Sequence, residues 1–391
     1  MNLQVVFSGD ILVGGEVGER IGRSTIKEWV ADVSNVWSGA DLLIGNLECP
    51  CVIKAKPLGG QAPELIFSAP VTRLAELADA GFSAVTIANN HILNCGTLGL
   101  KETLQGLDSA GIHHAGAGMN LAEAMQPAFV RIKGLTIGLV AFCYGPAASW
   151  STAGVAPYDF KVMGRSLNLA RAGADFVVAA LHDGLEYSDV PPSETRARFR
   201  FLAENGADIV VGHHPHVLQG LEWIGNVPVA YSLGNFLFHS SLPHVTQRSF
   251  RRIAMGLYAP QEIQRDPEKF SRGALLSVDI SGTTKSAQWH PFTQTSDLRP
   301  QLCAGQDKTE RIRHLADLSA ALHNEQDFRH ALANSILHTV QWKNRQGLTT
   351  RELIKMALNP KWRYLPQGMK WLLQRMRVSK EPSLPDGFSS D

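Results

Sequence analysis

Side chains that can bind metal ions follow apolar, strand-like runs at several places in the first two thirds of the chain. The runs at residues 3–9 and 209–212 are apolar or β-branched almost up to their polar residue, so we expect the polar groups to leave strands at one rim. Carboxylate, imidazole and amide oxygen atoms converging from several strand ends form a catalytic divalent metal site. The residues predicted there are Asp10, Glu48, Asn90, His91, His182, His214 and His216.

The strongest single motif is Gly212-His213-His214-Pro215-His216. On an extended segment, residues two apart face the same side, so His214 and His216 can point at one metal cluster. The alternative is that both are loop histidines with ordinary hydrogen bonds. His213, on the opposite face, is predicted to be structural.

The pair Asn90-His91 combines an amide with an imidazole. An Asn carbonyl oxygen is a neutral, hard metal ligand, and the adjacent His91 cannot easily bind the same ion, which leaves it to act on substrate as an acid or hydrogen-bond donor. The alternative is an Asx-type turn that only caps the next helix, which we expect for Asn89. His182 has no informative local spacing, so its prediction depends on the other histidines.

Strand-like and helix-like segments alternate up to about residue 240, which indicates an α/β fold. Two further pairs of strand-like runs, 129–132 with 136–142 and 274–280 with 286–293, are typical of hairpins. Mixed parallel and antiparallel strands predict two packed sheets with helices outside. The predicted helices are 26–37, 71–80, 98–110, 164–172 and 193–205.

Beyond residue 300 the pattern changes to helix throughout. We therefore expect a main domain over residues 1–300, a helical basic C-terminal extension over 301–378 and a disordered tail over 379–391. The segment 342–380 is rich in Lys and Arg with Trp interleaved, so it could lie on an anionic membrane surface or dock an acidic protein partner. The alternative is a helical cap that packs its Leu and Trp on the main domain and exposes its charges.

Composition fits a soluble enzyme larger than one small domain. The 391 residues are 44% hydrophobic and 19% charged, and the net charge of +1 offers no reason to expect nucleic acid binding. No apolar run approaches the ~20 residues that span a bilayer, and no signal peptide pattern precedes the first predicted strand, so we expect a cytoplasmic protein. Five cysteines, an odd number, are expected to be reduced thiols.

Six motifs in order resemble the CapA family of poly-γ-glutamate capsule biosynthesis proteins over about residues 3–240, and that family is similar in turn to the calcineurin-like metallophosphatases. The resemblance implies a two-sheet β-sandwich flanked by helices with a site for two divalent ions. It also implies that Asp10 and Glu48 are carboxylate ligands, with Glu48 bridging, that Asn90, His182, His214 and His216 complete the shells, and that His91 is the catalytic imidazole. The motifs are Gly9-Asp10, Gly45-Asn46-Leu47-Glu48, Asn89-Asn90-His91, His182-Asp183-Gly184-Leu185-Glu186-Tyr187, Gly212 to His216 and Tyr231-Ser232-Leu233-Gly234-Asn235-Phe236.

The chain departs from these patterns at three positions and in one segment. Leu12 stands where the phosphatases have a ligand His, so one of the two ions is expected to bind weakly or not at all. Asn94 stands where the capsule proteins often have Asp, and Asp183 where they often have Trp. The membrane anchor of many capsule proteins has no counterpart in this sequence.

An anionic substrate, small molecule or polymer, suits the predicted charge. Two divalent ions facing only Asp10 and Glu48 would leave an excess of positive charge, which favours a phosphoester and accommodates a glutamyl-type amide. Mixed N and O ligands suit Mn, Fe or Zn. Asn235 and the arginines Arg248, Arg251 and Arg252 are predicted substrate contacts, the alternative for the arginines being a solvated basic loop.

These patterns leave two hypotheses about function. The first is a divalent-metal hydrolase of cell-envelope or polymer metabolism. The second is a non-catalytic accessory or assembly subunit of a polymer synthase or exporter, to which Leu12 and Asn94 lend weight.

Overall fold

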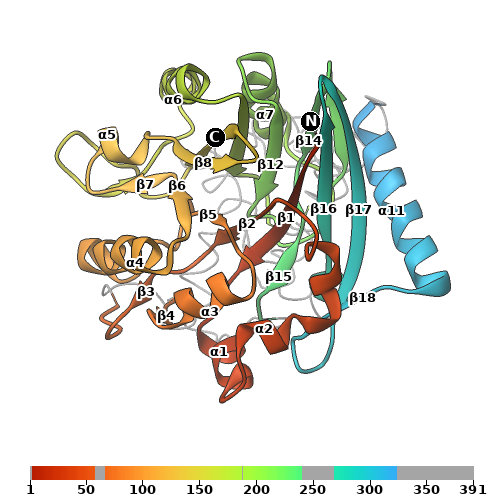
Figure 1. Cartoon of the computed structure of the whole chain (residues 1–391), viewed down its shortest axis with the longest axis horizontal. Helices are drawn as coiled ribbons and strands as arrows, with labels where there is room; N and C mark the ends of the chain where they lie inside the picture. Colours follow the sequence, from red (N-terminus) through yellow and green to blue (C-terminus); the bar gives the residue numbers. More distant parts are fainter. Residues whose placement is uncertain (1, 58–66, 187, 240–267, 324–391) are drawn as a thin grey trace, which may run out of the picture.

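Two packed β-sheets with helices on their outer faces form the body of the protein in the computed structural model (Figure 1). The structure describes residues 2–57, 67–186, 188–239 and 268–323. The first sheet has the strand order β18-β17-β16-β1-β2-β5-β6, with β15 also paired to β1, and the second has the order β13-β14-β12-β11-β9-β8. This arrangement confirms the predicted sandwich.

The strands of the first sheet are β1 (Asn2–Ile11), β2 (Leu42–Leu47), β5 (Ala84–Thr86), β6 (His113–Ala115), β15 (Asn235–Leu237), β16 (Arg272–Ser281), β17 (Thr284–Gln294) and β18 (Pro300–Leu302). Those of the second are β8 (Ala128–Ile132), β9 (Leu135–Cys143), β11 (Phe176–His182), β12 (Ile209–His213), β13 (Leu221–Ile224) and β14 (Val227–Ala230). Two small ribbons pair β3 (Cys51–Val52) with β4 (Ala69–Pro70) and β7 (Ala117–Gly118) with β10 (Gly154–Val155).

In the described ranges the helices are α1 (Gly15–Ile21), α2 (Ile26–Trp29), α3 (Arg73–Asp79), α4 (Gly96–Ala110), α5 (Leu121–Ala124), α6 (Phe160–Gly173), α7 (Ser193–Glu204), α10 (Glu268–Ser271) and α11 (Gly305–His323), together with the 3-10 helix η1 (Ala31–Val36). The helix predicted over 26–37 is therefore two short pieces, because Val30 leaves the α conformation (φ −101°, ψ 12°). Both predicted hairpins are confirmed, as β8–β9 and β16–β17, each antiparallel.

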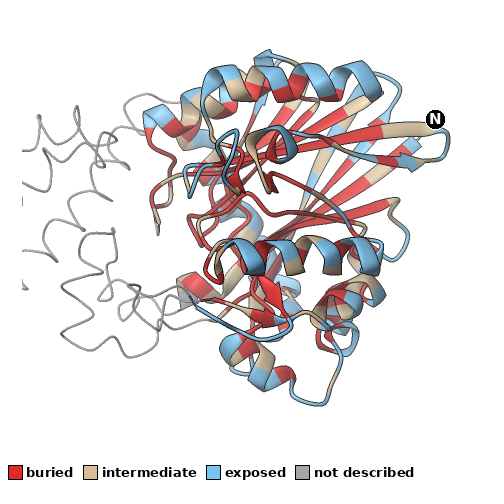
Figure 2. Ribbon diagram, turned by 90° about the vertical axis from the view of Figure 1, so that its left-hand side faces the viewer, coloured by how far each residue is buried: buried red, intermediate tan, exposed pale blue. Residues whose placement is uncertain are grey.

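Alternation of apolar side chains along the strands produces a layered core. Val5 and Phe7 of β1 belong to the cluster between the two sheets, which also contains Val178 of β11. Val6, between them in sequence, packs with the helical layer over the first sheet instead. Figure 2 shows mostly buried strands at the centre of the molecule, while the outer faces of the flanking helices are exposed.

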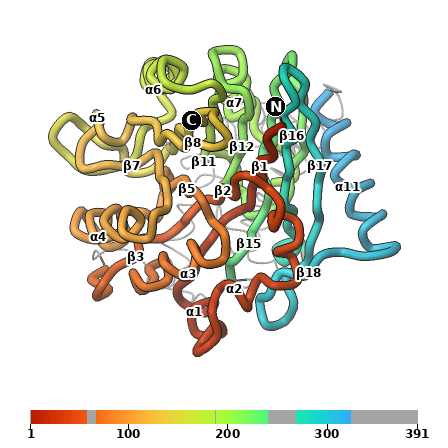
Figure 3. Tube along the Cα trace, viewed as in Figure 1, coloured from red at the N-terminus to blue at the C-terminus, as the bar shows by residue number. Residues whose placement is uncertain are grey.

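The segment from Tyr231 to Gly234 runs from β14 in one sheet to β15 in the other, where β15 lies beside β1 (Figure 3). A Cβ atom on Gly9 would lie 1.9 Å from the Gly234 carbonyl oxygen, and one on Gly212 would lie 1.9 Å from that of Tyr231. Only glycine allows so close an approach between backbones. These two glycines thus let the ends of β1 and β12, just before Asp10 and His214, reach the same place.

The region after residue 300 joins the body over its described part. Strand β18 pairs with β17, so the predicted boundary at residue 300 falls inside a strand. Helix α11 buries Leu315 and Leu318 against Leu218 and Ala274. The helices predicted beyond residue 323, the basic segment 342–380 and the tail 379–391 lie outside the described residues. Within the described ranges, no helix has the length and apolar character that crossing a bilayer requires.

Candidate metal centre

Four strand ends from the two sheets meet at one place. Asp10 lies near the end of β1 and Glu48 directly follows β2, while His182 ends β11 and His214 directly follows β12. β1 is parallel to β2, and β11 is parallel to β12, so the carboxyl ends of each pair lie at one edge of their sheet. The first sheet contributes the candidate oxygen ligands and the second sheet the candidate imidazole ligands.

Glu48 is fully buried, and neither of its carboxylate oxygens has a hydrogen-bond partner among the described residues. Its Oε1 lies 3.6 Å from His182 Nε2 and 3.8 Å from His216 Nε2, too far for hydrogen bonds. Two ligands of one cation, each with a bond of about 2 Å, lie about 3–4 Å apart. Burial and the nearby charge of Asp10 raise the pKa of Glu48 well above its usual range.

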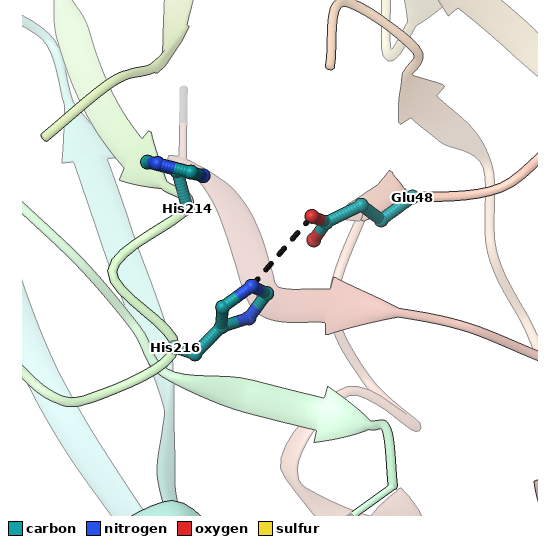
Figure 4. Close-up of side chains that lie close together, drawn as sticks. All are labelled: Glu48, His214 and His216. Atoms are coloured by element: carbon teal, nitrogen blue, oxygen red, sulfur yellow. Dashed lines mark ion pairs between the residues drawn. The ribbon is translucent and has the colours of Figure 1, made fainter. Parts of the chain in front are cut away.

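Figure 4 shows Glu48 facing His214 and His216, with the Glu48–His216 ion pair drawn as a dashed line. The candidate ligand atoms of these three buried residues lie within 4.8 Å of one another, as do those of Asp10, Glu48 and His182. Glu48 belongs to both sets. It is therefore the geometric centre of the candidate site.

Asp10 is also fully buried, but nitrogen atoms surround it. Asn46 Nδ2 donates to Oδ1 at 2.8 Å, and the backbone N–H of His214 donates to Oδ2 at 3.4 Å. The ring Nδ1 of His213 lies 3.2 Å from Oδ1, outside hydrogen-bond geometry, and Nδ1 of His216 lies 3.4 Å from Oδ2. Burial would raise the pKa of Asp10, but His213 and His216 hold it well below its usual range.

His182 connects the two sheets through both ring nitrogens. Its Nε2 lies 2.8 Å from Asn90 Oδ1, and its Nδ1 lies 3.3 Å from Asn46 Nδ2. Burial and the neighbouring His214 keep the pKa of His182 well below its usual range, so the ring is neutral, the form that binds metal. His182 Nε2 thus lies near both Asn90 Oδ1 and the Glu48 carboxylate.

His214 and His216 occupy backbone conformations that favour glycine, with φ of 100° and 57°. Such conformations cost about 1–3 kcal/mol each and cluster at functional sites. Nδ1 of His214 is buried without a hydrogen-bond partner in the described part of the chain, and burial together with His216 lowers its pKa to about 3. Burial alone would lower the pKa of His216, but the carboxylates of Glu48 and Asp10 raise it to about 10.

Asn235, predicted as a substrate contact, is 2% exposed. Its Oδ1 lies 2.9 Å from His216 Nδ1, which is also the ring nitrogen that faces Asp10. Both neighbours are acceptors, so Nδ1 carries a proton and Nε2 points toward Glu48. This burial favours an orienting role for Asn235 over the predicted contact with substrate.

His91 belongs to neither candidate ligand group found among the described residues, and its predicted role is to act on substrate beside Asn90. Asn94 Oδ1 lies 2.9 Å from His91 Nδ1 and also accepts the backbone N–H of Phe67 at 2.9 Å. Because this oxygen is an acceptor, His91 Nδ1 is the donor, and in the neutral ring Nε2 is the basic atom. The Phe67 ring stacks on the imidazole at 4.1 Å between centroids, which fixes its plane. Asn89 forms the expected turn by accepting the N–H of His91.

Three residues near the site were not predicted to take part. Asn46 stands inside a quoted motif, yet its contacts with Asp10 and His182 depend on packing between the sheets. His213 faces Asp10, whereas alternation along the strand predicted a structural role. Glu186 is partly buried with an unpartnered Oε2, and burial raises its pKa to about 7. A carboxylate within the His182 motif was the available signal.

The predicted contacts Arg248, Arg251 and Arg252 lie outside the described residues.

Comparison with known sequences identifies the family. A profile described as "Bacterial capsule synthesis protein PGA_cap" matches residues 4–240, and the chain belongs to this family. It is 33% identical over 244 residues to the "PGA biosynthesis protein CapA" of Bacillus subtilis (strain 168), covering 60% of this chain and 63% of the relative. The "Capsule biosynthesis protein CapA" of Bacillus anthracis is 31% identical over 245 residues, with 60% of each chain covered. The chain thus spans about three fifths of the length of these relatives.

Among solved structures, the chain is similar to the "novel phosphatase" from Mycoplasma pneumoniae, with a TM-score of 0.46 and 14% sequence identity. The match covers 75% of this chain and 94% of that protein.

Proposed function

We propose that the protein serves in the biosynthesis of poly-γ-glutamate or a related cell-envelope polymer, as a divalent-metal-dependent hydrolase. Family membership and the printed names of its relatives support the biosynthetic role. The hydrolase activity is supported by the centre around Glu48. The substrate class we propose is an anionic phosphoester or a glutamyl-type amide.

The observation that carries the proposal is the state of Glu48. A buried carboxylate without hydrogen bonds is costly, and buried charges in proteins are usually paired or bound to metal. Both oxygens of Glu48 and Nδ1 of His214 are buried and unpartnered within the described residues. These atoms fit a divalent cation, because it would satisfy them together.

The residues that would hold the cation are Glu48, Asn90, His182, His214 and His216, with Asp10 beside them. A divalent ion bound there supplies a Lewis acid that lowers the pKa of water and favours anionic substrates. His91, fixed by Asn94 and Phe67, stands outside this ligand set with Nε2 as its basic atom. It would exchange a proton with the leaving group or stabilise developing charge.

Metal analysis of the purified protein followed by a phosphoester and glutamyl-amide screen tests the proposal. We expect bound Mn, Fe or Zn and turnover that falls about 10²–10⁴-fold in His91→Ala while metal content is retained. The matched control is His113→Ala, an exposed histidine on β6. Metal-free protein that gains no activity or stability from added manganese would contradict the proposal.

A second candidate is a non-catalytic accessory subunit of a polymer synthase or exporter. Two observations favour it: Leu12 is buried in the apolar core, and Asn94 offers His91 a neutral partner where a carboxylate would strengthen the base. This candidate predicts metal-free protein that added manganese does not affect, and no turnover for His91→Ala to change.

The basic segment 342–380 adds a proposal about location. We propose a cytoplasmic protein that associates with the inner membrane surface or an acidic partner through this segment. Full-length protein should sediment with vesicles containing anionic phospholipid and not with neutral phosphatidylcholine vesicles, and added salt should weaken the binding. Equal sedimentation with both vesicle types would count against an electrostatic docking surface.

A further inference from the structure

The two buried carboxylates at the centre differ in how far the protein already satisfies them. An ionised carboxylate offers about four lone-pair sites on two oxygens. Asp10 accepts two hydrogen bonds, from Asn46 Nδ2 at Oδ1 and from the His214 N–H at Oδ2. Two imidazole nitrogens also face its oxygens, His213 Nδ1 at 3.2 Å from Oδ1 and His216 Nδ1 at 3.4 Å from Oδ2. Each oxygen of Asp10 is therefore already engaged by protein nitrogens.

Glu48 is the opposite case. Its oxygens accept no hydrogen bond from the described residues, although both are fully buried. The nearest imidazole nitrogens, on His182 and His216, approach only to 3.6 and 3.8 Å. That spacing leaves room for a cation between the carboxylate and the rings.

The position two residues after Asp10 adds no ligand. Leu12 is 2% exposed and packs in the apolar cluster beneath the helices of the first sheet. On the Asp10 side the remaining candidate ligand is His216, whose Nδ1 is already directed at Asn235 and Asp10. Its Nε2 lies 3.8 Å from Glu48 Oε1.

Asp10 also contacts the segments that carry the other ligands. Through Asn46 it reaches His182, and through the His214 backbone and His216 it reaches the loop after β12. A single anion thus holds together loops from both sheets. Residues that contact metal ligands without binding the metal orient those ligands in this way.

We propose that the centre holds one divalent ion, bound by Glu48 and the surrounding imidazoles, and that Asp10 is a positioning residue that aligns the ligand loops instead of binding a second ion. The inference rests on the proposed function, because it requires that the centre binds metal. One ion binds per chain, and Glu48, not Asp10, is the carboxylate that binds it.

The number of ions in the unmodified protein is the first test. Titration of metal-free protein with Mn²⁺ by calorimetry should give one ion per chain, and electron paramagnetic resonance should show the sextet of an isolated Mn²⁺. Two ions per chain with an exchange-coupled multiline signal would overturn the inference and leave the proposed function standing. Absence of binding would remove the proposed function and the inference together.

Variants then separate the two carboxylates. Glu48→Gln should abolish Mn²⁺ binding, whereas Asp10→Asn should keep one ion per chain with a dissociation constant about 10–100-fold higher, the usual cost of losing an outer partner of a metal ligand. Asp183→Asn is the matched control, since this buried carboxylate next to His182 pairs with Arg198 at 2.7 Å and should leave the stoichiometry unchanged. If Asp10→Asn does not fold, the resonance spectrum of the unmodified protein still decides. An Asp10→Asn protein that folds but binds no ion would contradict the positioning role.

Discussion

Two buried glutamates in different regions of the molecule show opposite solutions to the same physical problem. Glu222, on β13 of the second sheet, is 1% exposed and accepts hydrogen bonds from Arg196, Arg200 and the Tyr231 hydroxyl. Glu48, beside the first sheet, is equally buried and accepts none from the described residues. A buried carboxylate with hydrogen-bond donors supports the fold, whereas one without them indicates a place kept for a ligand.

We expect the largest loss of stability from a substitution at Gly212, where the regions of Glu48 and Glu222 are joined. Gly212→Ala places a Cβ atom 1.9 Å from the Tyr231 carbonyl oxygen, on the residue whose hydroxyl pairs with Glu222. The backbone must shift, so we expect a loss of about 3 kcal/mol or more in the free energy of unfolding. Chemical denaturation measures it, with Gly39→Ala as the control, since no atom lies within 4 Å of that Cβ position. Equal effects at the two glycines would contradict the close approach.

Removing the charge of Glu222 should lower the free energy of unfolding by somewhat less than Gly212→Ala does. Glu222→Gln leaves Arg196 and Arg200 without their carboxylate, and breaking a buried ion pair costs about 3 kcal/mol. Denaturation at neutral pH should show this loss, while the exposed Glu19→Gln should change stability by less than about 0.5 kcal/mol.

The same Glu-to-Gln substitution at position 48 should instead raise the free energy of unfolding of the metal-free protein. Glu48→Gln removes a buried carboxylate that accepts no hydrogen bond from the described residues and meets its nearest imidazoles only at 3.6 and 3.8 Å, so we expect a gain of about 1–3 kcal/mol in the presence of a chelator. Added Mn²⁺ should stabilise the unmodified protein and not the variant, so the unmodified protein then becomes the more stable of the two. A Glu48→Gln protein that is less stable than the metal-free parent would mean that Glu48 has donors of its own.

The pH dependence of stability should separate the two glutamates further. The folded-state pKa of Glu48 is raised above 4.5 by burial and Asp10, so its favourable contribution is present below that pH and lost as pH rises through the raised pKa. Burial would raise the pKa of Glu222, but Arg196 and Tyr231 lower it, so its contribution is present above 4.5 and lost as pH falls through the lowered pKa. As pH falls, metal-free parent protein should therefore gain stability relative to Glu48→Gln and lose it relative to Glu222→Gln. Parallel curves for both variants would rule this out.

The smallest effect concerns the partner of His91. Asn94→Asp keeps an oxygen acceptor for His91 Nδ1 and the Phe67 N–H but adds a charge that stabilises the imidazolium. The pH–rate profile of any substrate found should move to higher pH, with a change in turnover smaller than that of His91→Ala. An unchanged profile would mean that His91 does not titrate in the reaction.

Regular elements with clear local patterns were predictable. Both hairpins and helices α4, α6 and α7 lie close to their predicted ranges, because periodic apolar residues and turn residues act over short distances. Strand β18 was missed, since three residues beginning with Pro300 carry no periodicity and become a strand only by pairing with β17.

Residue types and their positions after strand-like runs were enough to predict which side chains could bind metal, because ligand chemistry is a local property of each residue. The sequence by itself did not determine which of those side chains are already satisfied. Asp10 and His214 are 204 positions apart, and their contact exists only because two sheets pack and the segment from Tyr231 to Gly234 crosses between them. Hydrogen-bond partners across such separations depend on tertiary packing, so only the folded structure distinguishes Asp10, which accepts hydrogen bonds from both sheets, from Glu48, which accepts none from the described residues.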